Sequence, residues 1–151
     1  CLFTSIMEFK DFGASVAALR ASSEAEDVGI YASGHMVTKP TRKEAEDYYH
    51  YIVYETGDWE AAEHAVAIRT KGRDTPLKKL TTLRERMISG VGTYPVVGSY
   101  DDVVDEYRQM SECGVNGMAI GLVNYIADFP VLRDEILPRM ERLGLRLPAA
   151  A

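Results

Sequence analysis

The stretch from residue 94 to residue 146 constrains the fold of this chain more than any other. Ser99, followed three residues later by Asp102, is a helix-start pattern. Residues 117–123 (GMAIGLV) are apolar at every position except the two glycines, which is typical of a strand that helices cover on both sides. A helix, a buried strand and a second helix in this order predict part of a parallel α/β fold.

The first third of the chain predicts the same alternation. Residues 1–6 and 28–37 are apolar and rich in strand-forming residues, so we expect two strands there. The alanine-rich residues 14–25 between them predict a helix. Thr41 and Glu44 form a capping box, which places another helix start directly after the second strand. Strands that alternate with helices favour a parallel sheet with right-handed crossovers.

An unusually long helical connection separates the second and third expected strands. Helical periodicity runs through residues 59–70 and 77–89, on either side of a loop at residues 71–76. We therefore predict an insertion over one face of the sheet, at about residues 55–93. The second of these helices is expected to bury an apolar stripe, which consists of Leu80, Leu83, Met87 and Ile88.

The final helix carries apolar residues at helical spacing, and Pro138 removes one amide donor from it and should kink it. The side chains expected to be buried are Phe129, Leu132, Ile136 and Met140.

Composition argues against several classes of partner. The net charge of −6 and the pI of about 5.1 disfavour nucleic-acid binding and an anionic membrane surface. The sequence has no run of about 18 apolar residues that would suggest a membrane span. The two cysteines, Cys1 and Cys113, are too few for a disulfide framework or a zinc site, so we expect a cytoplasmic protein. Because the chain opens directly in a strand-like run without a methionine, we expect it to be the carboxyl-terminal piece of a longer protein.

Chemical signals in the sequence are sparse, and no nucleotide-binding or metalloenzyme motif is present. His35 lies near the end of an expected strand, where an active site would form in a parallel barrel, although a structural histidine is the alternative. Asn124 and Tyr125 follow the last strand directly. They would either contact a ligand or cap the turn into the next helix. Ser5 is a weaker candidate, by its position at the end of the first strand.

Three further candidates flank the loop of the insertion. Trp59, Arg69 and Arg73 would suit a lid over an anionic or aromatic substrate. The alternative is a packed tryptophan and two solvated arginines. His50 and His64 lie among acidic residues on helices, but such neighbours are common and we expect no metal site.

Four short motifs, in order along the chain, resemble those of the bacterial-luciferase-like flavin-dependent monooxygenases. The run at residues 97–103 (VGSYDDV) is similar to the family's "VGT/S-x-x-x-V" helix entry, and residues 114–117 (GVNG) look like its "AGVDG" link into the last barrel strand. Residues 135–140 resemble its closing helix, and residues 41–45 resemble its "T-x-x-E-A" motif. The resemblance covers nearly the whole chain, from about the fifth strand onward. The sulfone-, sulfonate- and pyrimidine-oxidising members are the most similar.

This resemblance implies a fold of the α/β class. Residues 1–151 would form the carboxyl-terminal portion of a TIM (β/α)8 barrel with a helical insertion. The resemblance also implies an enzyme that uses reduced FMN from a partner flavin reductase, with O2, to insert one oxygen atom into a small organic substrate, for which organosulfur and heterocyclic compounds are the candidates. A homo-oligomer is expected. The family's serine-rich phosphate-binding segment would precede residue 1, so this piece is expected to be inactive alone.

The expected catalytic residues are His35, Asn124 and Arg73. Ser5 and Tyr125 are expected to bind the cofactor. Trp59 and Arg69 are expected to belong to a lid over the substrate. Two other functions remain open at this point. One is a deazaflavin-dependent oxidoreductase of the same superfamily. The other is a non-catalytic α/β module that binds a ligand or partner.

Overall fold

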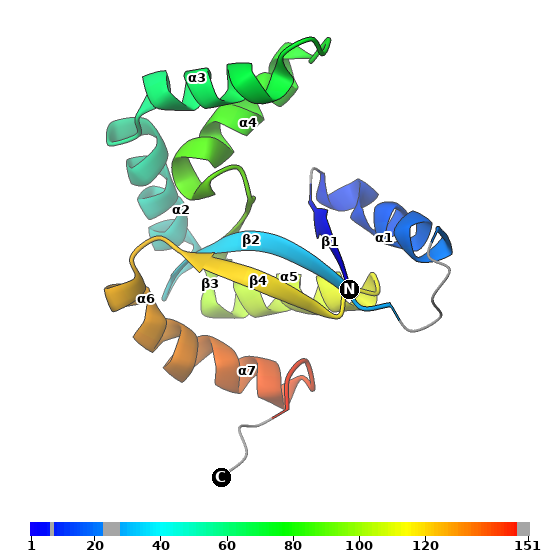
Figure 1. Ribbon diagram of the computed structural model, residues 1–151. Coiled ribbons are helices and arrows are strands. Elements are labelled where there is room, and N and C mark those ends of the chain that lie inside the picture. Colours follow the sequence, from blue (N-terminus) through cyan, green and yellow to red (C-terminus); the bar gives the residue numbers. More distant parts are fainter. Residues whose placement is uncertain (7, 23–27, 148–151) are drawn as a thin grey trace.

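A parallel sheet with helices around it forms the centre of the computed structural model, which describes residues 1–6, 8–22 and 28–147 (Figure 1). The strands are β1 (Leu2–Ser5), β2 (Ile30–Lys39), β3 (Tyr94–Ser99) and β4 (Gly117–Leu122). Strand and helix alternate along the chain, as the sequence predicts. The expected α/β class and the parallel sheet are confirmed.

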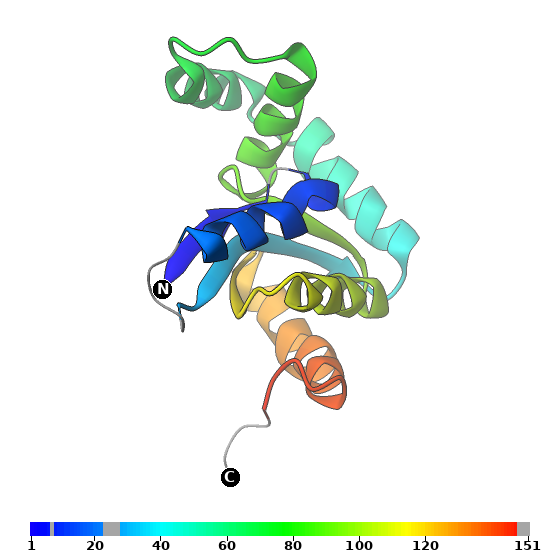
Figure 2. The ribbon, with the colours of Figure 1, turned by 90° about the vertical axis from the view of Figure 1, so that its right-hand side faces the viewer.

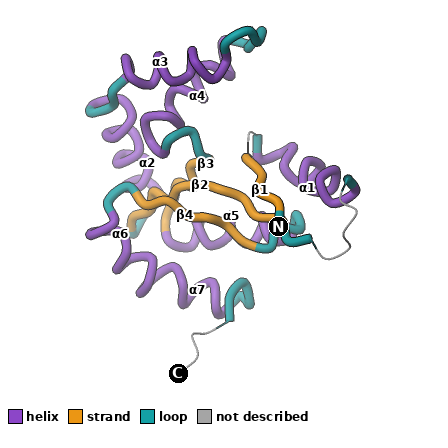
Figure 3. Tube along the Cα trace, in the orientation of Figure 1, coloured by secondary structure: helices purple, strands orange, loops and turns teal. Residues whose placement is uncertain are grey.

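Helices fill most of the remaining chain, as the colouring of Figure 3 shows. The helical elements are η1 (Phe9–Asp11), α1 (Phe12–Ala21), α2 (Arg42–His50), η2 (Tyr51–Glu55), α3 (Trp59–Thr70), α4 (Leu77–Gly90), α5 (Tyr100–Glu112), α6 (Tyr125–Val131), η3 (Leu132–Ile136) and α7 (Leu137–Arg142). The segments η2 and η3 are π-helical, whereas η1 is a 3-10 turn. Among the described residues, no helix combines the length and the apolarity that crossing a bilayer requires.

Strand β2 is the central strand of the sheet, because all three other strands pair with it. Residues 30–33 pair with β1 and residues 34–39 pair with β3, while residues 31–36 pair with β4. Residues that pair twice use both edges, so β1 and β3 follow one another along one edge and β4 occupies the other. A barrel with strands in chain order would pair β4 with β3. Here the short β1 and β3 share one edge of β2, which leaves its opposite edge to β4.

One face of the sheet holds the hydrophobic core, and we call it the core face. Even-numbered residues of β2, such as Ile30 and Met36, point to this face and are buried with Val16 of α1 and Val103 of α5. Ile136 of η3 is fully buried in the same cluster. The amphipathic helices predicted before and after the strands therefore supply the core. The expectation that helices cover the strand at residues 117–123 on both sides is wrong, because Ala119 of β4 is exposed on the opposite face.

Two local predictions are confirmed in atomic detail. Thr41 and Glu44 form the expected capping box at the start of α2, and Ser99 and Asp102 form one at the start of α5. Arg42 joins these two helix starts, because its Nη2 lies 2.6 Å from Oδ1 of Asp102. Both boxes lie at the carboxyl ends of strands and fix the direction in which the chain leaves the sheet.

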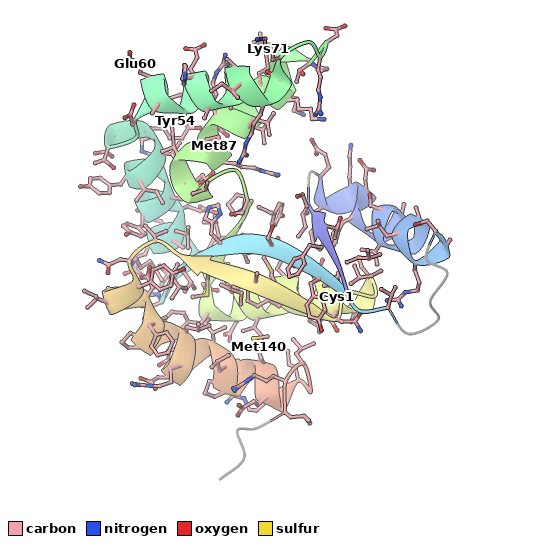
Figure 4. The ribbon with its side chains drawn as sticks, in the orientation of Figure 1. Cys1, Tyr54, Glu60, Lys71, Met87 and Met140 are labelled. Carbon is pink, nitrogen blue, oxygen red and sulfur yellow. The ribbon has the colours of Figure 1, made fainter. Side chains whose placement is uncertain are left out.

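The final helix differs from expectation at one end. Ile136 is buried and Leu132 and Met140 pack against the core, but the prediction for Phe129 is wrong, since its side chain is 54% exposed. The π-helical segment η3 follows Phe129 and adds a residue to the turn. The residues after that turn therefore keep the core-facing stripe, and Phe129 falls outside it. Figure 4 shows Met140 on the side of α7 nearest the sheet.

Three further features differ from the sequence-based expectation. The helix expected at residues 14–25 is α1, which begins earlier, and residues 23–25 lie outside the described residues. The third expected strand, which the apolar residues 96 and 97 indicate, is β3, and it begins earlier, at Tyr94. In α4 the expected stripe is only half-buried, and the buried side chain of that helix is Arg86. Arg86 can be buried there because its guanidinium finds hydrogen-bonding and aromatic partners.

Helices α3 and α4 pack against each other as a hairpin, which extends away from the sheet in both Figure 1 and Figure 2. The loop that joins them lies at the outer end of the hairpin. The carboxyl end of α4 returns to the sheet and leads into β3. The long connection predicted from the sequence therefore has one end against the sheet and the other end far from it.

Candidate functional site

The face of the sheet opposite the core face carries the odd-numbered residues of β1, β2 and β4, and we call it the His35 face. Its residues are Phe3, Ser5, Tyr31, Ser33, His35, Val37, Lys39, Gly117, Ala119 and Gly121. The rings of Phe3 and Tyr31 lie 5.7 Å apart on this face, and Phe3 is 67% exposed. The His35 face is thus lined mainly by small and aromatic side chains, and much of it is accessible.

His35 is the buried polar residue of this face, with only 3% of its surface exposed. Its Nδ1 lies 2.9 Å from Oγ1 of Thr93. The Thr93 hydroxyl donates its single proton to the carbonyl oxygen of Gly90, at 2.7 Å. Oγ1 therefore accepts from His35, which makes Nδ1 the protonated nitrogen of the neutral ring. The geometry leaves Nε2 with a lone pair.

The imidazole of His35 stays neutral in this environment. Burial, and after it the positive charge of Arg86, lower the pKa of His35 to about 4. Nε2 is buried and has no hydrogen-bond partner among the described residues. A buried acceptor of this kind is uncommon, because leaving a polar atom unpaired costs about 1–3 kcal/mol. It marks His35 as a candidate ligand-binding group.

The end of α4 covers His35 and leaves room for its ring. A Cβ added at Gly90 would lie 2.1 Å from Nδ1, so only glycine fits there. Val91 adopts a left-handed conformation with φ of 55°, and the amide of Gly92 donates to the carbonyl oxygen of Arg86. A β-branched residue is strained in this region. This turn places Thr93 against His35.

On its other side His35 contacts strand β4. A Cβ built at Gly121 would lie 3.4 Å from the Cβ of His35, which is ordinary contact distance. A Cβ built at Gly117 would lie 2.8 Å from the ring of Tyr31, which is too close, so glycine is needed there. The glycines of the apolar strand thus make room for the two rings of β2 on this face.

Arg86 is the second buried polar group near the site. Its Nη1 donates to the carbonyl oxygen of Ile6, at 2.7 Å, just beyond the end of β1. Its guanidinium lies over the ring of Tyr94, 5.0 Å from the centroid. Tyr94 in turn bonds to Glu106 of α5, and burial raises the pKa of both groups. Arg86 therefore links α4 to the ends of two strands.

Of the cofactor-binding and catalytic candidates, Ser5 lies on the same face as His35. Ser5 is exposed at the end of β1, where it pairs with Ser33 of β2. Asn124 lies at the carboxyl end of β4 and acts as the N-cap of α6, because its Oδ1 accepts from the amides of Ile126 and Ala127. Its backbone N–H donates to Oδ2 of the buried Asp128. The capping role considered for Asn124 is present in the structure.

Tyr125 is the first residue of α6, and its side chain is largely exposed. It lies beside Asn124 at the rim of the sheet's carboxyl edge.

The three lid candidates lie in different environments. Trp59 begins α3, and its indole donates to the carbonyl oxygen of Val53 at 3.0 Å while its ring lies against Tyr54. Arg69 reaches back to the site's turn, since a Cβ at Gly92 would lie 2.4 Å from its Nη1. Arg73 is exposed in the loop at the outer end of the hairpin. Of the three, only Arg69 is brought close to the residues around His35.

Sequence reasoning missed Gly90, Thr93 and Arg86. The run Gly90-Val91-Gly92 is visible in the sequence and marks a turn, but nothing local indicates that it packs on a residue 55 positions earlier. Arg86 lies on a helix whose apolar spacing favours its neighbours for burial. Among the described residues, no cluster of three or more His, Cys, Asp or Glu side chains is placed to hold a metal ion.

Solved structures share this arrangement of elements. DmoA from Hyphomicrobium sulfonivorans aligns with a TM-score of 0.78 and 19% identity over 98% of this chain. Riboflavin lyase (RcaE), solved with modified FMN and its substrate riboflavin, aligns with a TM-score of 0.75 and 20% identity over 96% of this chain. Long-chain alkane monooxygenase (LadA) aligns over the whole chain with a TM-score of 0.74 and 16% identity.

The chain has the luciferase-like monooxygenase fold. It spans 38–39% of the length of these three structures, so it corresponds to part of their TIM barrel. No protein-family model matches the sequence, and no curated protein matches it. At identities of 16–20% the likeness concerns the fold, and function has to be argued from the site. In TIM barrels the active site lies at the carboxyl ends of the strands.

Proposed function

We propose that this chain is part of a flavin-dependent monooxygenase, which uses reduced FMN and O2 to oxygenate a small organic substrate. The observation that carries the proposal is the neutral, buried His35 on the accessible sheet face of a luciferase-like fold. Its unpaired Nε2 is the one buried histidine acceptor that the described residues contain. The other two histidines, His50 and His64, are exposed on helices.

The residues around His35 fit one face of a flat ring. Gly117, Ala119 and Gly121 present little bulk, and the aromatic rings of Phe3 and Tyr31 border them. Nε2 of His35 would accept a hydrogen bond from a ring N–H of the reduced flavin or from a substrate donor. When bound, reduced FMN supplies two electrons, so that one oxygen atom of O2 enters the substrate and the other leaves as water.

The chain's own residues then have distinct proposed roles. Thr93 holds the tautomer of His35 by accepting from Nδ1, and Gly90 leaves space for the ring. Ser5 offers a hydroxyl on the same face, toward the cofactor. Asn124, Tyr125 and the hairpin at residues 55–93 border the site at its rim. Arg69, which lies beside the turn after α4, would border the substrate, whereas Trp59 and Arg73 would cover it and exclude water only when the hairpin closes toward the sheet.

The proposal extends to the partners. A separate flavin reductase would supply reduced FMN, and a homo-oligomer in the cytoplasm is the expected assembly. By the family resemblance, the flavin phosphate would be held by residues outside this chain. Organosulfur compounds and nitrogen heterocycles are the proposed substrate classes.

Turnover of the natural full-length polypeptide tests this function. With FMN, NADH, a flavin reductase and O2, we expect oxygenated product from at least one member of a panel of sulfones, sulfonates and pyrimidines. His35→Phe should lower kcat/KM by about 10²-fold, as loss of a positioned polar group in an active site does. His64→Phe is the matched control on an exposed helix. No product from the wild type over the whole panel, or equal kinetics in both variants, would refute the proposal.

A further inference from the structure

Arg86 is buried, whereas arginines on helices are usually exposed to solvent. It is 7% exposed, near the end of α4, and it lies against the ends of β1 and β3. A buried arginine needs strong partners, because removing a guanidinium from water is costly. The carbonyl oxygen of Ile6 accepts one of its hydrogen bonds, and the Tyr94 ring faces its plane.

Arg86 also acts on the groups around it through its charge. It is the charged neighbour that disfavours protonation of His35, after burial itself. Burial raises the pKa of Tyr94 on β3 and of Tyr49 on α2, whereas the charge of Arg86 acts to lower both. Glu106 of α5 bonds to Tyr94. Glu85, adjacent on α4, is engaged by the hydroxyl of Tyr54 at 2.6 Å. The charged group that acts on His35 is therefore positive and buried.

We infer that Arg86 is a positioning residue for the proposed reaction: it holds the end of α4, and with it Thr93, over His35, so that Nε2 is the ring nitrogen left as the hydrogen-bond acceptor. Two observations combine in this assignment. The contact with Ile6 ties α4 to β1, while the turn after α4 places Thr93 on Nδ1. The same helix end thus fixes both the position of the ring and its protonation state.

This inference rests on the proposed function and narrows the ligand chemistry of the site. An acceptor that stays unprotonated binds an N–H or O–H donor and does not favour an anionic group such as a sulfonate at that atom. The group that meets Nε2 would be a ring N–H of the reduced flavin or of a pyrimidine-like heterocycle. To bind an anion through Nε2, His35 would itself have to be protonated. The buried positive charge of Arg86 opposes that protonation.

NMR of the full-length protein with ring-¹⁵N-labelled histidine tests the assignment. In the wild type we expect Nδ1 protonated and Nε2 unprotonated at pH 6. Arg86→Gln keeps a donor for Ile6 and removes the charge, so the pKa of His35 should rise by about one pH unit. Arg86→Lys keeps the charge, and the pKa should stay near the wild-type value. Arg84→Gln, on the same helix and paired with Glu63, is the matched control and should change nothing.

The outcomes separate the possibilities. A purely structural role predicts that Gln and Lys at position 86 both lower the melting temperature and leave the pKa of His35 in place, which would overturn the inference. If Arg86→Gln does not fold, Arg86→Lys decides, and a His35 that is protonated at pH 6 in that variant overturns it. Because the NMR measurement requires no turnover, a failed oxygenation assay would sink the proposed function alone. Oxygenation with an unmoved pKa in Arg86→Gln would sink the inference alone.

Discussion

The two faces of the sheet are built from alternate residues of the same strands, yet they differ sharply. On the core face, Ile30, Met36 and Val96 are buried against three helical elements. On the His35 face, Phe3 is exposed and Gly117 and Ala119 have little side chain, while Val37 and the imidazole of His35 are buried, the latter under the end of α4. One face supplies stability and the other leaves room and an unpaired acceptor, which is how folds commonly separate scaffold from site.

The largest expected contrast between the faces is in the effect of side-chain truncation. Ile136→Ala removes a fully buried side chain from the core face and should lower the free energy of unfolding by about 2–5 kcal/mol. Phe3→Ala on the His35 face should cost less than about 1 kcal/mol. Urea unfolding monitored by circular dichroism measures both. Equal losses would mean that the His35 face is as tightly packed as the core.

The next contrast is in pH dependence, which comes from the His35 face. The unfolded chain takes up a proton on this histidine near pH 6.5, whereas the folded chain does so only at about pH 4. The unfolded state therefore binds more protons between these values, and stability falls as the pH is lowered through this window. The loss attributable to His35 should be about 3 kcal/mol and complete below pH 4.

His35→Gln provides the comparison for this pH effect, because glutamine does not titrate. The difference in unfolding free energy between wild type and variant should change between pH 7 and pH 4, as measured by urea titrations at each pH. A difference that stays constant with pH would show that His35 titrates normally in the folded protein.

A smaller effect is expected at the glycines that contact His35 from two sides. Gly90→Ala places a methyl group 2.1 Å from Nδ1 and should destabilise the fold by about 1–3 kcal/mol through overpacking. At Gly121 the contact would be 3.4 Å, so Gly121→Ala should be tolerated. Thermal unfolding of the two variants distinguishes them. Equal melting temperatures would contradict the close cover of His35 by α4.

The smallest effect is expected at the rim. Asn124→Ala removes the N-cap of α6 and should cost about 1 kcal/mol of stability. We also expect it to impair turnover of the full-length enzyme, because α6 begins at the carboxyl edge of the sheet. Ser99→Ala removes the corresponding cap of α5 and serves as the control for helix destabilisation alone. Identical turnover losses in both variants would leave Asn124 with a capping role only.

The capping boxes show what the sequence could predict. Thr41 with Glu44, and Ser99 with Asp102, interact across three residues, so the pattern itself contains the interaction. The strands and most helices followed from periodicity for the same reason. Phe129 was mispredicted because a π-helical segment changed the helical register after it.

The site was predicted less completely, because its contacts are remote in sequence. Ser5 could be selected from its place at a strand end. His35 was selected as a residue near the end of the expected strand at residues 28–37, which is wrong because β2 continues to Lys39. Thr93 bonds to His35 across 58 residues and Arg86 to Ile6 across 80. Those contacts depend on where the end of α4 returns to the sheet. No spacing rule within α3 or α4 specifies that return, so Thr93 and Arg86 had no local signal.

The central claim is that the His35 face binds the reacting flavin or substrate through Nε2 of His35. Its most direct measurement is the ¹⁵N chemical shift of that nitrogen in the full-length protein, recorded without oxygen before and after addition of reduced FMN and then of a pyrimidine. We predict that one addition moves the Nε2 signal upfield, as an accepted hydrogen bond does, while the signals of His50 and His64 stay in place. An Nε2 signal that neither addition moves would contradict the claim.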